Sequence, residues 1–194
     1  MRLVLASSSP RRADLLRAAG IPFDLFPVEI DERFRLEEKP ERAVARLAEA
    51  KAAVAAASHP DAIVLGADTT VVVCGESLAK PADAEDAARM LRLLSGRSHV
   101  VLTGVCVWHQ GRRLVHVEPT RVRMAELGEA EIAWYVATGE PLDKAGGYAV
   151  QGLASRFIEE IDGSYSNVVG LPISSVYELL KELGCDILGG EKSQ

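Results

Sequence analysis

A run of hydroxyl side chains and two arginines near the amino terminus could bind an anion. Residues 7–12 read Ser-Ser-Ser-Pro-Arg-Arg, and Ser9 and Pro10 suit the cap and first position of a helix. A helix amino terminus carries partial positive charge, which Arg11 and Arg12 oppose unless an anion lies there. Backbone N–H groups, hydroxyls and guanidinium groups all suit phosphate oxygens. A capped helix with two solvated arginines accounts for the run equally well.

An acidic side chain interrupts a run of apolar residues. Residues 62–65 are Ala-Ile-Val-Leu, as in a strand buried on both faces, and the run resumes at residues 70–73. The intervening Gly-Ala-Asp-Thr predicts a break in the strand. Asp68 at that point could hold Mg²⁺ or orient an attacking water. The alternative is an aspartate in an Asx turn between two hairpin strands, and this residue by itself does not distinguish the two.

Further charged residues indicate a site only when they are considered together. Lys51 lies in an Ala-rich stretch, Lys80 precedes a proline, and Asp31 and Glu32 are adjacent. Taken singly, each is typical of a solvated surface charge. Residues 146–152 are rich in glycine, which would let the backbone approach another group closely.

The elements that must position these residues alternate between helix and strand. The pattern predicts a hairpin about residues 110–112, and the alternation predicts an α/β body on a mixed sheet, whose ligands would gather at the carboxyl ends of strands. Helices are expected at residues 10–20, 40–59, 84–94, 129–137 and 173–183. Strands or extended segments are expected at residues 3–6, 23–30, 62–65, 70–73, 100–108, 114–124, 146–152 and 157–161.

Bulk composition narrows the class of protein. The 194 residues are 48% hydrophobic and carry a formal net charge of -6, which suits one globular body and disfavours general nucleic-acid binding. We expect a single domain over residues 1–188, which could have two lobes, and a frayed tail at 189–194. Three dispersed cysteines and the lack of a long apolar run favour the cytoplasm, with no membrane attachment. The sequence contains no Gx4GK[ST], GxGxxG, HExxH or GxSxG motif.

Taken together, these segments resemble the Maf family, which is known for septum-related phenotypes and is regarded as a family of nucleoside triphosphate pyrophosphatases. The matching segments follow the expected order over nearly the whole chain, and the ordered set is far more specific than any one member. They are LASSSPRR (5–12), DE (31–32), LAEAKA (47–52), GADT (66–69), LAKP (78–81), LSG (94–96), EPLDKAG (140–146), YAVQG (148–152) and NVVGLP (167–172).

The resemblance implies an elongated, two-lobed α/β fold with a central cleft, shared with inosine triphosphate pyrophosphatases. It implies cleavage of a nucleoside triphosphate to its monophosphate and pyrophosphate, a divalent cation (Mg²⁺ or Mn²⁺) and frequently a homodimer. Asp68 matches the aspartate assigned as proton acceptor, and Asp68 and Glu32 would hold the metal. The residues implied for activity are Asp68, Glu32, Lys51 and Lys80, and those implied to face the phosphates are Ser7 and Arg12.

The resemblance also implies a base preference. Arg11, Thr69 and Gln151 match the subfamily that hydrolyses dTTP and UTP, whereas the 7-methyl-GTP group carries an aromatic residue, Gln and Glu at these places. A glutamine amide offers a donor beside an acceptor, which complements the carbonyl and N3–H of uracil. Modified pyrimidine nucleotides fit the same pattern.

Two alternatives stay open. One is a pyrophosphatase of other base specificity on the same scaffold. The other is a nucleotide-binding regulator of cell division and septum formation without significant catalysis. The second alternative expects Asp68, Lys51 or Lys80 to be missing, and all three are present.

Overall fold

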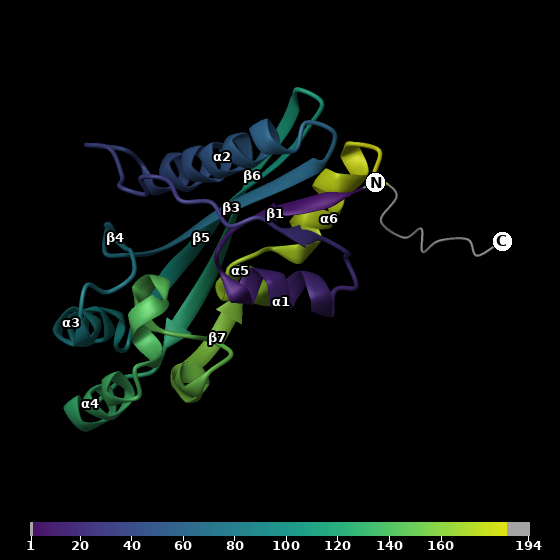
Figure 1. The fold of residues 1–194 in the computed structure, drawn as a ribbon. Helices are drawn as coiled ribbons and strands as arrows, with labels where there is room; N and C mark the ends of the chain where they lie inside the picture. The colour runs from purple at the N-terminus through teal and green to yellow at the C-terminus, as the bar shows by residue number, and fades with distance from the viewer. Residues whose placement is uncertain (1, 186–194) are drawn as a thin grey trace. The chain divides into compact units, whose positions relative to one another are not determined.

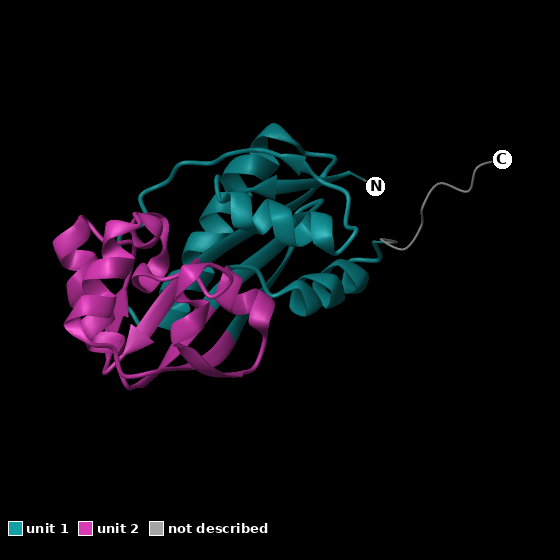
Figure 2. Ribbon diagram, turned by 90° about the horizontal axis from the view of Figure 1, so that it is seen from below, with its two compact units in different colours: residues 1–68, 103–118, 170–194 teal, residues 69–102, 119–169 magenta. Residues whose placement is uncertain are grey.

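A computed structural model describes residues 2–185, which fall into two compact units (Figure 2). Of these residues, 2–68, 103–118 and 170–185 belong to unit 1, and 69–102 and 119–169 belong to unit 2. The predicted domain limit at residue 188 and the predicted tail at 189–194 lie outside the described residues. Among residues 2–185, no helix has the length and apolar character that crossing a membrane requires.

Unit 1 is built on parallel strands that are covered on both faces (Figure 1). Alternate residues of β1 and β3 pack against α2 on one face, and the residues between them pack against α1 and α6 on the other. Burial on both faces explains why these strands read as continuous apolar runs. The elements are β1 (Leu3–Ala6), α1 (Pro10–Ala18), β2 (Asp24–Leu25), α2 (Pro40–Ser58), the first part of β3 (Ile63–Val73), and α6 (Ile173–Glu182).

The predicted break at residues 66–69 is wrong, because β3 runs without interruption from Ile63 to Val73. Gly66 pairs with Ala6 of β1 inside the parallel ladder. A Cβ atom on Gly66 would lie 2.3 Å from the carbonyl oxygen of Ala48 and 2.8 Å from the backbone nitrogen of Ala52. The glycine therefore allows the backbone of α2 to pack closely against the strand. In the sequence, a glycine that serves such a contact looks the same as one that marks a turn.

Unit 2 combines strands with short helices around its own apolar core. Its helices α3 and α4 both keep the residue limits that the sequence predicts. The elements are β4 (Glu76–Leu78), α3 (Ala84–Leu94), α4 (Glu129–Ala137), the 3₁₀ turns Glu140–Asp143, Ala145–Gly147 and Leu153–Phe157, β7 (Ile158–Asp162) and α5 (Tyr165–Val169). The hairpin strands β5 (Ser98–His109) and β6 (Arg112–Met124), like β3, contribute residues to both units.

The strands follow the order β2-β1-β3-β5-β6-β7, with β4 paired to β3. Parallel pairs at β1 and antiparallel pairs at β4 and β7 make the sheet mixed, as predicted. Hairpin residues Gln110 and Gly111 have φ of 48° and 78°, the left-handed conformation typical of a tight turn.

Of two segments predicted as extended or as strand, one forms only a short strand and the other is wrong. Only Asp24–Leu25 of residues 23–30 forms a strand. Residues 146–152 form turns, because Gly146 and Gly147 both take positive φ, at 71° and 70°, which a strand cannot contain. The backbone N–H of Gly146 donates to the carbonyl of Ala79 at 3.0 Å, so this segment packs beside the residue that precedes Lys80.

Candidate active site

Three predicted residues of unit 1 meet in one ionic cluster. The Nζ atom of Lys51 lies 2.7 Å from Oδ1 of Asp68 and 2.5 Å from Oε1 of Glu32. Lys51 is 5% exposed and Asp68 is 8% exposed, whereas about half of the Glu32 side chain is exposed. One ammonium group thus brings together two carboxylates from a strand and a distant loop.

Helix α2 places Lys51 in this cluster. The other buried residues of the helix are all apolar, and Leu47 and Ala55 lie one turn before and after Lys51 on the same stripe. The solvated-lysine interpretation is therefore wrong for Lys51. A buried ammonium is costly without a charged partner. The two carboxylates therefore stabilise the charged form of Lys51 in this buried position.

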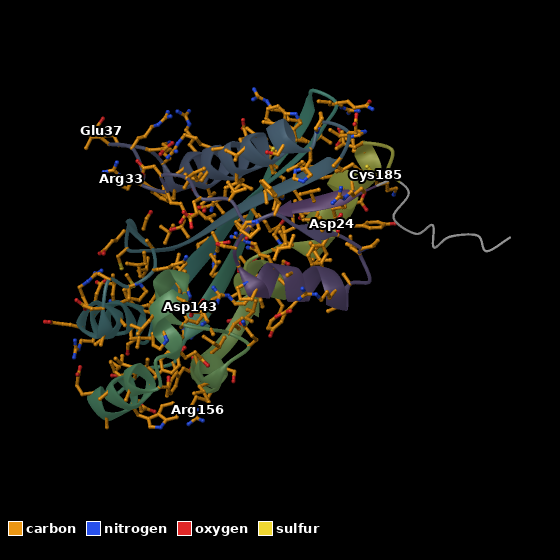
Figure 3. All side chains as sticks on the ribbon, viewed as in Figure 1. Asp24, Arg33, Glu37, Asp143, Arg156 and Cys185 are labelled. Atoms are coloured by element: carbon orange, nitrogen blue, oxygen red, sulfur yellow. The ribbon has the colours of Figure 1, made fainter. Side chains whose placement is uncertain are left out.

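The loop that carries Glu32 is fastened to the same helix by a second ion pair. Arg46 of α2 donates from Nε and Nη2 to the two carboxylate oxygens of Glu38 at 2.7 and 2.6 Å. These hydrogen bonds, together with one from the backbone N–H of Arg35, lower the pKa of Glu38 to about 2. Arg33 and Glu37, labelled in Figure 3, lie on this loop before α2. Of the two adjacent acids, Asp31 accepts hydrogen bonds of 2.7–3.1 Å from Arg33, whereas Glu32 forms the ion pair with Lys51.

Arg12 ties the first loop of the chain to the strand that carries Asp68. Its Nε donates to the carbonyl of Gly170 at 2.8 Å, and its Nη1 donates to the carbonyl of Ala67 at 2.9 Å and to Oγ of Ser7 at 3.2 Å. Burial lowers the pKa of Arg12, while Asp68 and Glu32 act to raise it. Arg12 is buried and makes three hydrogen bonds within unit 1, so the solvated alternative is wrong for this arginine.

The start of α1 retains groups that can bind an anion. Ser7 Oγ accepts hydrogen bonds from the Arg12 guanidinium and from the backbone N–H of Ser9 at 3.1 Å, which leaves its own proton available for donation. Ser9 occupies the cap position, yet within the described chain its side chain makes no capping hydrogen bond. The first turn of α1 carries no acidic residue, and partly buried Arg11 lies in it. These features suit phosphate oxygens.

The remaining predicted residues lie in unit 2. Thr69 follows Asp68 on β3 and is half-buried. Lys80 lies in an exposed bend after β4, and Gln151 lies exposed in the turn before the 3₁₀ turn Leu153–Phe157. The structure thus gathers Ser7, Arg12, Glu32, Lys51 and Asp68 within unit 1, and the participation of the unit 2 residues stays a prediction.

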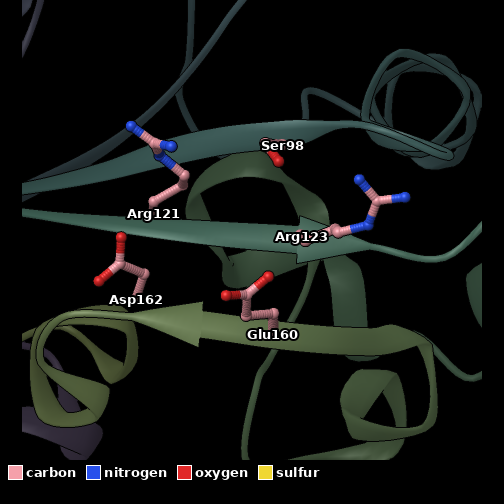
Figure 4. Close-up of a pocket in the computed structure, with 5 residues that line it drawn as sticks. All are labelled: Ser98, Arg121, Arg123, Glu160 and Asp162. Atoms are coloured by element: carbon pink, nitrogen blue, oxygen red, sulfur yellow. The ribbon is translucent and has the colours of Figure 1, made fainter.

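A separate hollow of about 120 Å³ in unit 2 has different chemistry (Figure 4). It is lined by Ser98, Arg121, Arg123, Glu160 and Asp162. The β6–β7 register pairs Arg121 with Asp162 and Arg123 with Glu160, so each arginine has an acidic residue opposite it. The two acids would repel a polyanion, and Arg123 forms its ion pair with Glu159, which does not line the hollow.

Unit 1 contains two carboxylates of the kind that bind a divalent cation. Within residues 2–185, no group of three or more His, Cys, Asp and Glu side chains is placed to hold a metal ion. Mg²⁺ commonly takes only one or two protein carboxylates and completes its shell with phosphate oxygens and water. Asp68 and Glu32, which contact the same ammonium group, supply two such carboxylates.

Some contributors to this arrangement have no signal in the sequence. The Glu38–Arg46 pair joins a loop to a helix, and the Gly170 carbonyl meets Arg12 across 158 positions. Neither spacing follows a helical or strand period. For Lys51 a signal existed, because it falls on the apolar stripe of a predicted helix.

The model of one protein family, described as Maf-like protein, matches residues 2–183. The chain belongs to the Maf family. Three relatives described as dTTP/UTP pyrophosphatase extend this similarity over nearly the full length. The relative from Syntrophus aciditrophicus is 49% identical over 98% of this chain and 94% of its own. The one from Symbiobacterium thermophilum is 51% identical over 97% of each, and the one from Anaeromyxobacter dehalogenans is 53% identical over 94% of each.

A solved structure, that of the Staphylococcus aureus Ham1 protein, resembles this Maf protein with a TM-score of 0.50. It covers 94% of this chain and 100% of the Ham1 chain at 16% sequence identity. A likeness at that identity concerns the fold alone, and it confirms the predicted α/β class.

Proposed function

We propose that this Maf protein hydrolyses dTTP and UTP to the nucleoside monophosphate and pyrophosphate with the help of a divalent cation. The observation that carries the proposal is the buried Lys51 ammonium between Asp68 and Glu32, with the Arg12 guanidinium bound to the carbonyl of Ala67, the neighbour of Asp68. The relatives described as dTTP/UTP pyrophosphatase, about 50% identical over nearly the full length, support the choice of substrate.

In the proposed reaction, water attacks the α-phosphorus, the bond to the bridging oxygen breaks, and pyrophosphate leaves. Asp68 either accepts the proton of that water or serves only as a metal ligand beside Glu32. When bound, a divalent cation would lower the pKa of a water and offset charge on phosphate oxygens. Lys51 holds the two carboxylates together, so their charges are fixed before substrate arrives.

The phosphates would be held by groups at the start of α1. Ser7 can donate its hydroxyl proton to a phosphate oxygen, and the first N–H groups of α1 point along the helix axis toward an anion. Arg12 contributes positive charge and keeps the loop in register with β3 through Ala67 and Gly170. No covalent intermediate is needed, because positioning and electrostatics suffice for phosphoryl-group chemistry.

The unit 2 residues would complete recognition. We propose that Lys80 meets the phosphates and that Gln151 reads the pyrimidine edge with its amide, assisted by Arg11 and Thr69. A site built to pair with a base edge rejects a base that leaves its polar groups unpaired. We also place the enzyme in the cytoplasm and propose that it forms a homodimer, which light scattering would test.

A panel of nucleoside triphosphates with Mg²⁺ or Mn²⁺ tests the proposed function. Pyrophosphate and nucleoside monophosphate are measured separately from orthophosphate for dTTP, UTP, CTP, ATP, GTP and 7-methyl-GTP. The expected result is the highest kcat/KM for dTTP and UTP, with equal yields of monophosphate and pyrophosphate. Preference for a purine nucleotide would overturn the base assignment. Binding without turnover would favour the regulator of cell division instead.

A further inference from the structure

We propose that Glu140 is a positioning residue for Gln151 and thereby sets base selectivity; this inference rests on the proposed function. Glu140 begins the 3₁₀ turn Glu140–Asp143 directly after Gly139, whose φ of 76° ends the preceding helical segment. Its carboxylate contacts the turn that carries Gln151, which follows it in the chain. All of the residues in this arrangement belong to unit 2.

The carboxylate of Glu140 fixes the chain on the far side of Gln151. Its Oε2 accepts from the backbone N–H of Leu153 at 3.1 Å, and its Oε1 lies 3.4 Å from the backbone nitrogen of Ala154. These two N–H groups open the 3₁₀ turn Leu153–Phe157, where backbone donors have no partner within the turn itself. A carboxylate at this end is also favourable, because its negative charge offsets the partial positive charge of those donors.

Tyr135 extends the same network to the near side of Gln151. Its hydroxyl donates to Oε1 of Glu140 at 2.7 Å and accepts from the backbone N–H of Ala149 at 3.1 Å. Tyr135 is fully buried on α4, and its pKa is raised by burial and by the Glu140 hydrogen bond, so the phenol keeps the proton that it donates. Glu140 and Tyr135 therefore hold the backbone two positions before and two positions after Gln151.

Gly152 shows how closely the carboxylate approaches this turn. A Cβ atom there would lie 2.4 Å from Oε2 of Glu140 and 2.6 Å from its Cδ. The backbone N–H of Gly152 also donates to the carbonyl of Ala149 at 3.0 Å and closes the turn. Gln151 is exposed at the tip, so its orientation depends on the backbone around it. We infer that the Glu140 carboxylate limits the directions in which the Gln151 amide can point.

Glu140→Gln tests this role with little change of volume. A glutamine amide places N–H donors where at least one oxygen now accepts, so a backbone N–H of the turn loses its acceptor. We measure kcat/KM for UTP and GTP and express selectivity as their ratio. The expected result is a decrease of about tenfold in that ratio. Tyr135→Phe, which removes the hydroxyl between Glu140 and Ala149, should lower the ratio in the same direction.

A double-mutant cycle separates positioning from loss of stability. In a Gln151→Ala background, Glu140→Gln should change the ratio by less than about twofold, because the side chain that it positions is gone. Glu131→Gln is the matched control: Glu131 accepts from the backbone N–H of Gly128 at 2.8 Å at the start of α4, away from the Gln151 turn. It should leave the ratio unchanged even where it lowers the unfolding midpoint.

The outcomes distinguish this inference from the proposed function. An equal effect of Glu140→Gln with and without Gln151, or an unchanged ratio, would overturn the positioning role. If wild-type protein shows no pyrimidine preference, or if Gln151→Ala leaves selectivity intact, the base-reading part of the proposed function fails first. A selective Gln151 combined with a neutral Glu140→Gln would reject only the inference made here.

Discussion

The ammonium group of Lys51 is buried on an otherwise apolar helix stripe and lies 2.7 Å from Oδ1 of Asp68. This pair joins α2 to β3, and Glu32 adds a second carboxylate at 2.5 Å. Removal of one partner from a buried ion pair leaves a charge without compensation, which usually costs more than the intact pair contributes. The cluster therefore has measurable consequences for stability as well as for catalysis.

Replacement of Lys51 by methionine should lower the free energy of unfolding by about 3 kcal/mol. Methionine is also unbranched and is only one atom shorter, but it leaves Asp68 without its ammonium partner. Urea unfolding at neutral pH measures the change. Lys39→Met, at the exposed cap position of the same helix, is the control and should shift stability by less than about 0.5 kcal/mol. Equal midpoints for the two variants would show that the buried pair does not couple α2 to β3.

Replacement of Gly66 by alanine should lower the free energy of unfolding by about 2–3 kcal/mol, because the added Cβ would overlap the backbone of α2 at Ala48. Gly128→Ala is the matched control, since a Cβ there meets only Oε2 of Glu131 at 3.6 Å and the glycine has negative φ. The control should cost less than about 1 kcal/mol. Near-normal stability of Gly66→Ala would mean that the helix does not approach β3 as closely as described.

Stability should fall in mild acid because of His99, which is 2% exposed and has its Nε2 atom 2.7 Å from the Tyr148 hydroxyl. Burial lowers the pKa of His99 from 6.5 to about 4. The unfolded chain therefore binds the extra proton first, and the stability that neutral His99 contributes is present above pH about 6.5 and is lost toward pH 4.

The size of this loss is at most about 3 kcal/mol, and comparison with His99→Gln isolates it. The measurement is the free energy of unfolding of both proteins from pH 7 to pH 4. The wild-type curve should decline more steeply, so that the difference between the two proteins changes across this range. Parallel curves would assign the acid sensitivity to other groups.

Replacement of Gln151 by glutamate should reduce kcat/KM for UTP at least about tenfold, because a carboxylate cannot donate to the uracil carbonyl. The residue is exposed, so the free energy of unfolding should change by less than about 0.5 kcal/mol. Steady-state kinetics with UTP and GTP, together with thermal unfolding, check both parts. An unchanged UTP-to-GTP ratio would argue against base reading by this side chain.

Features encoded by local sequence were predictable. The limits of α4 and the hairpin about Gln110 and Gly111 follow from apolar periodicity and from turn residues, and the structure confirms them. The continuity of β3 was not predictable, because the glycine at position 66 is required by a close contact with α2 and does not mark a turn. The prediction of a strand at residues 146–152 was wrong for a similar reason. Glycines that bound a strand and glycines that take positive φ in a turn look alike in the sequence.

The candidate site was predictable in its residue types but not in its partnerships. The resemblance selected Lys51 and Asp68, yet only tertiary structure shows that they share an ion pair. Arg12 reaches the Gly170 carbonyl, a contact that no sequence spacing indicates. Glu140 belongs to a recognisable motif, while its hydrogen bonds to Tyr135 and Leu153 depend on the fold of unit 2.

The most direct test of the central claim is the turnover of UTP by Asp68→Asn, measured as pyrophosphate release with Mg²⁺ or Mn²⁺. The amide keeps the shape of the side chain but removes the charge that pairs with Lys51 and that would hold a cation or accept a proton. We expect a folded protein, by circular dichroism and thermal unfolding, whose kcat is lower by at least about 100-fold. A folded Asp68→Asn protein with near-normal kcat would contradict the account.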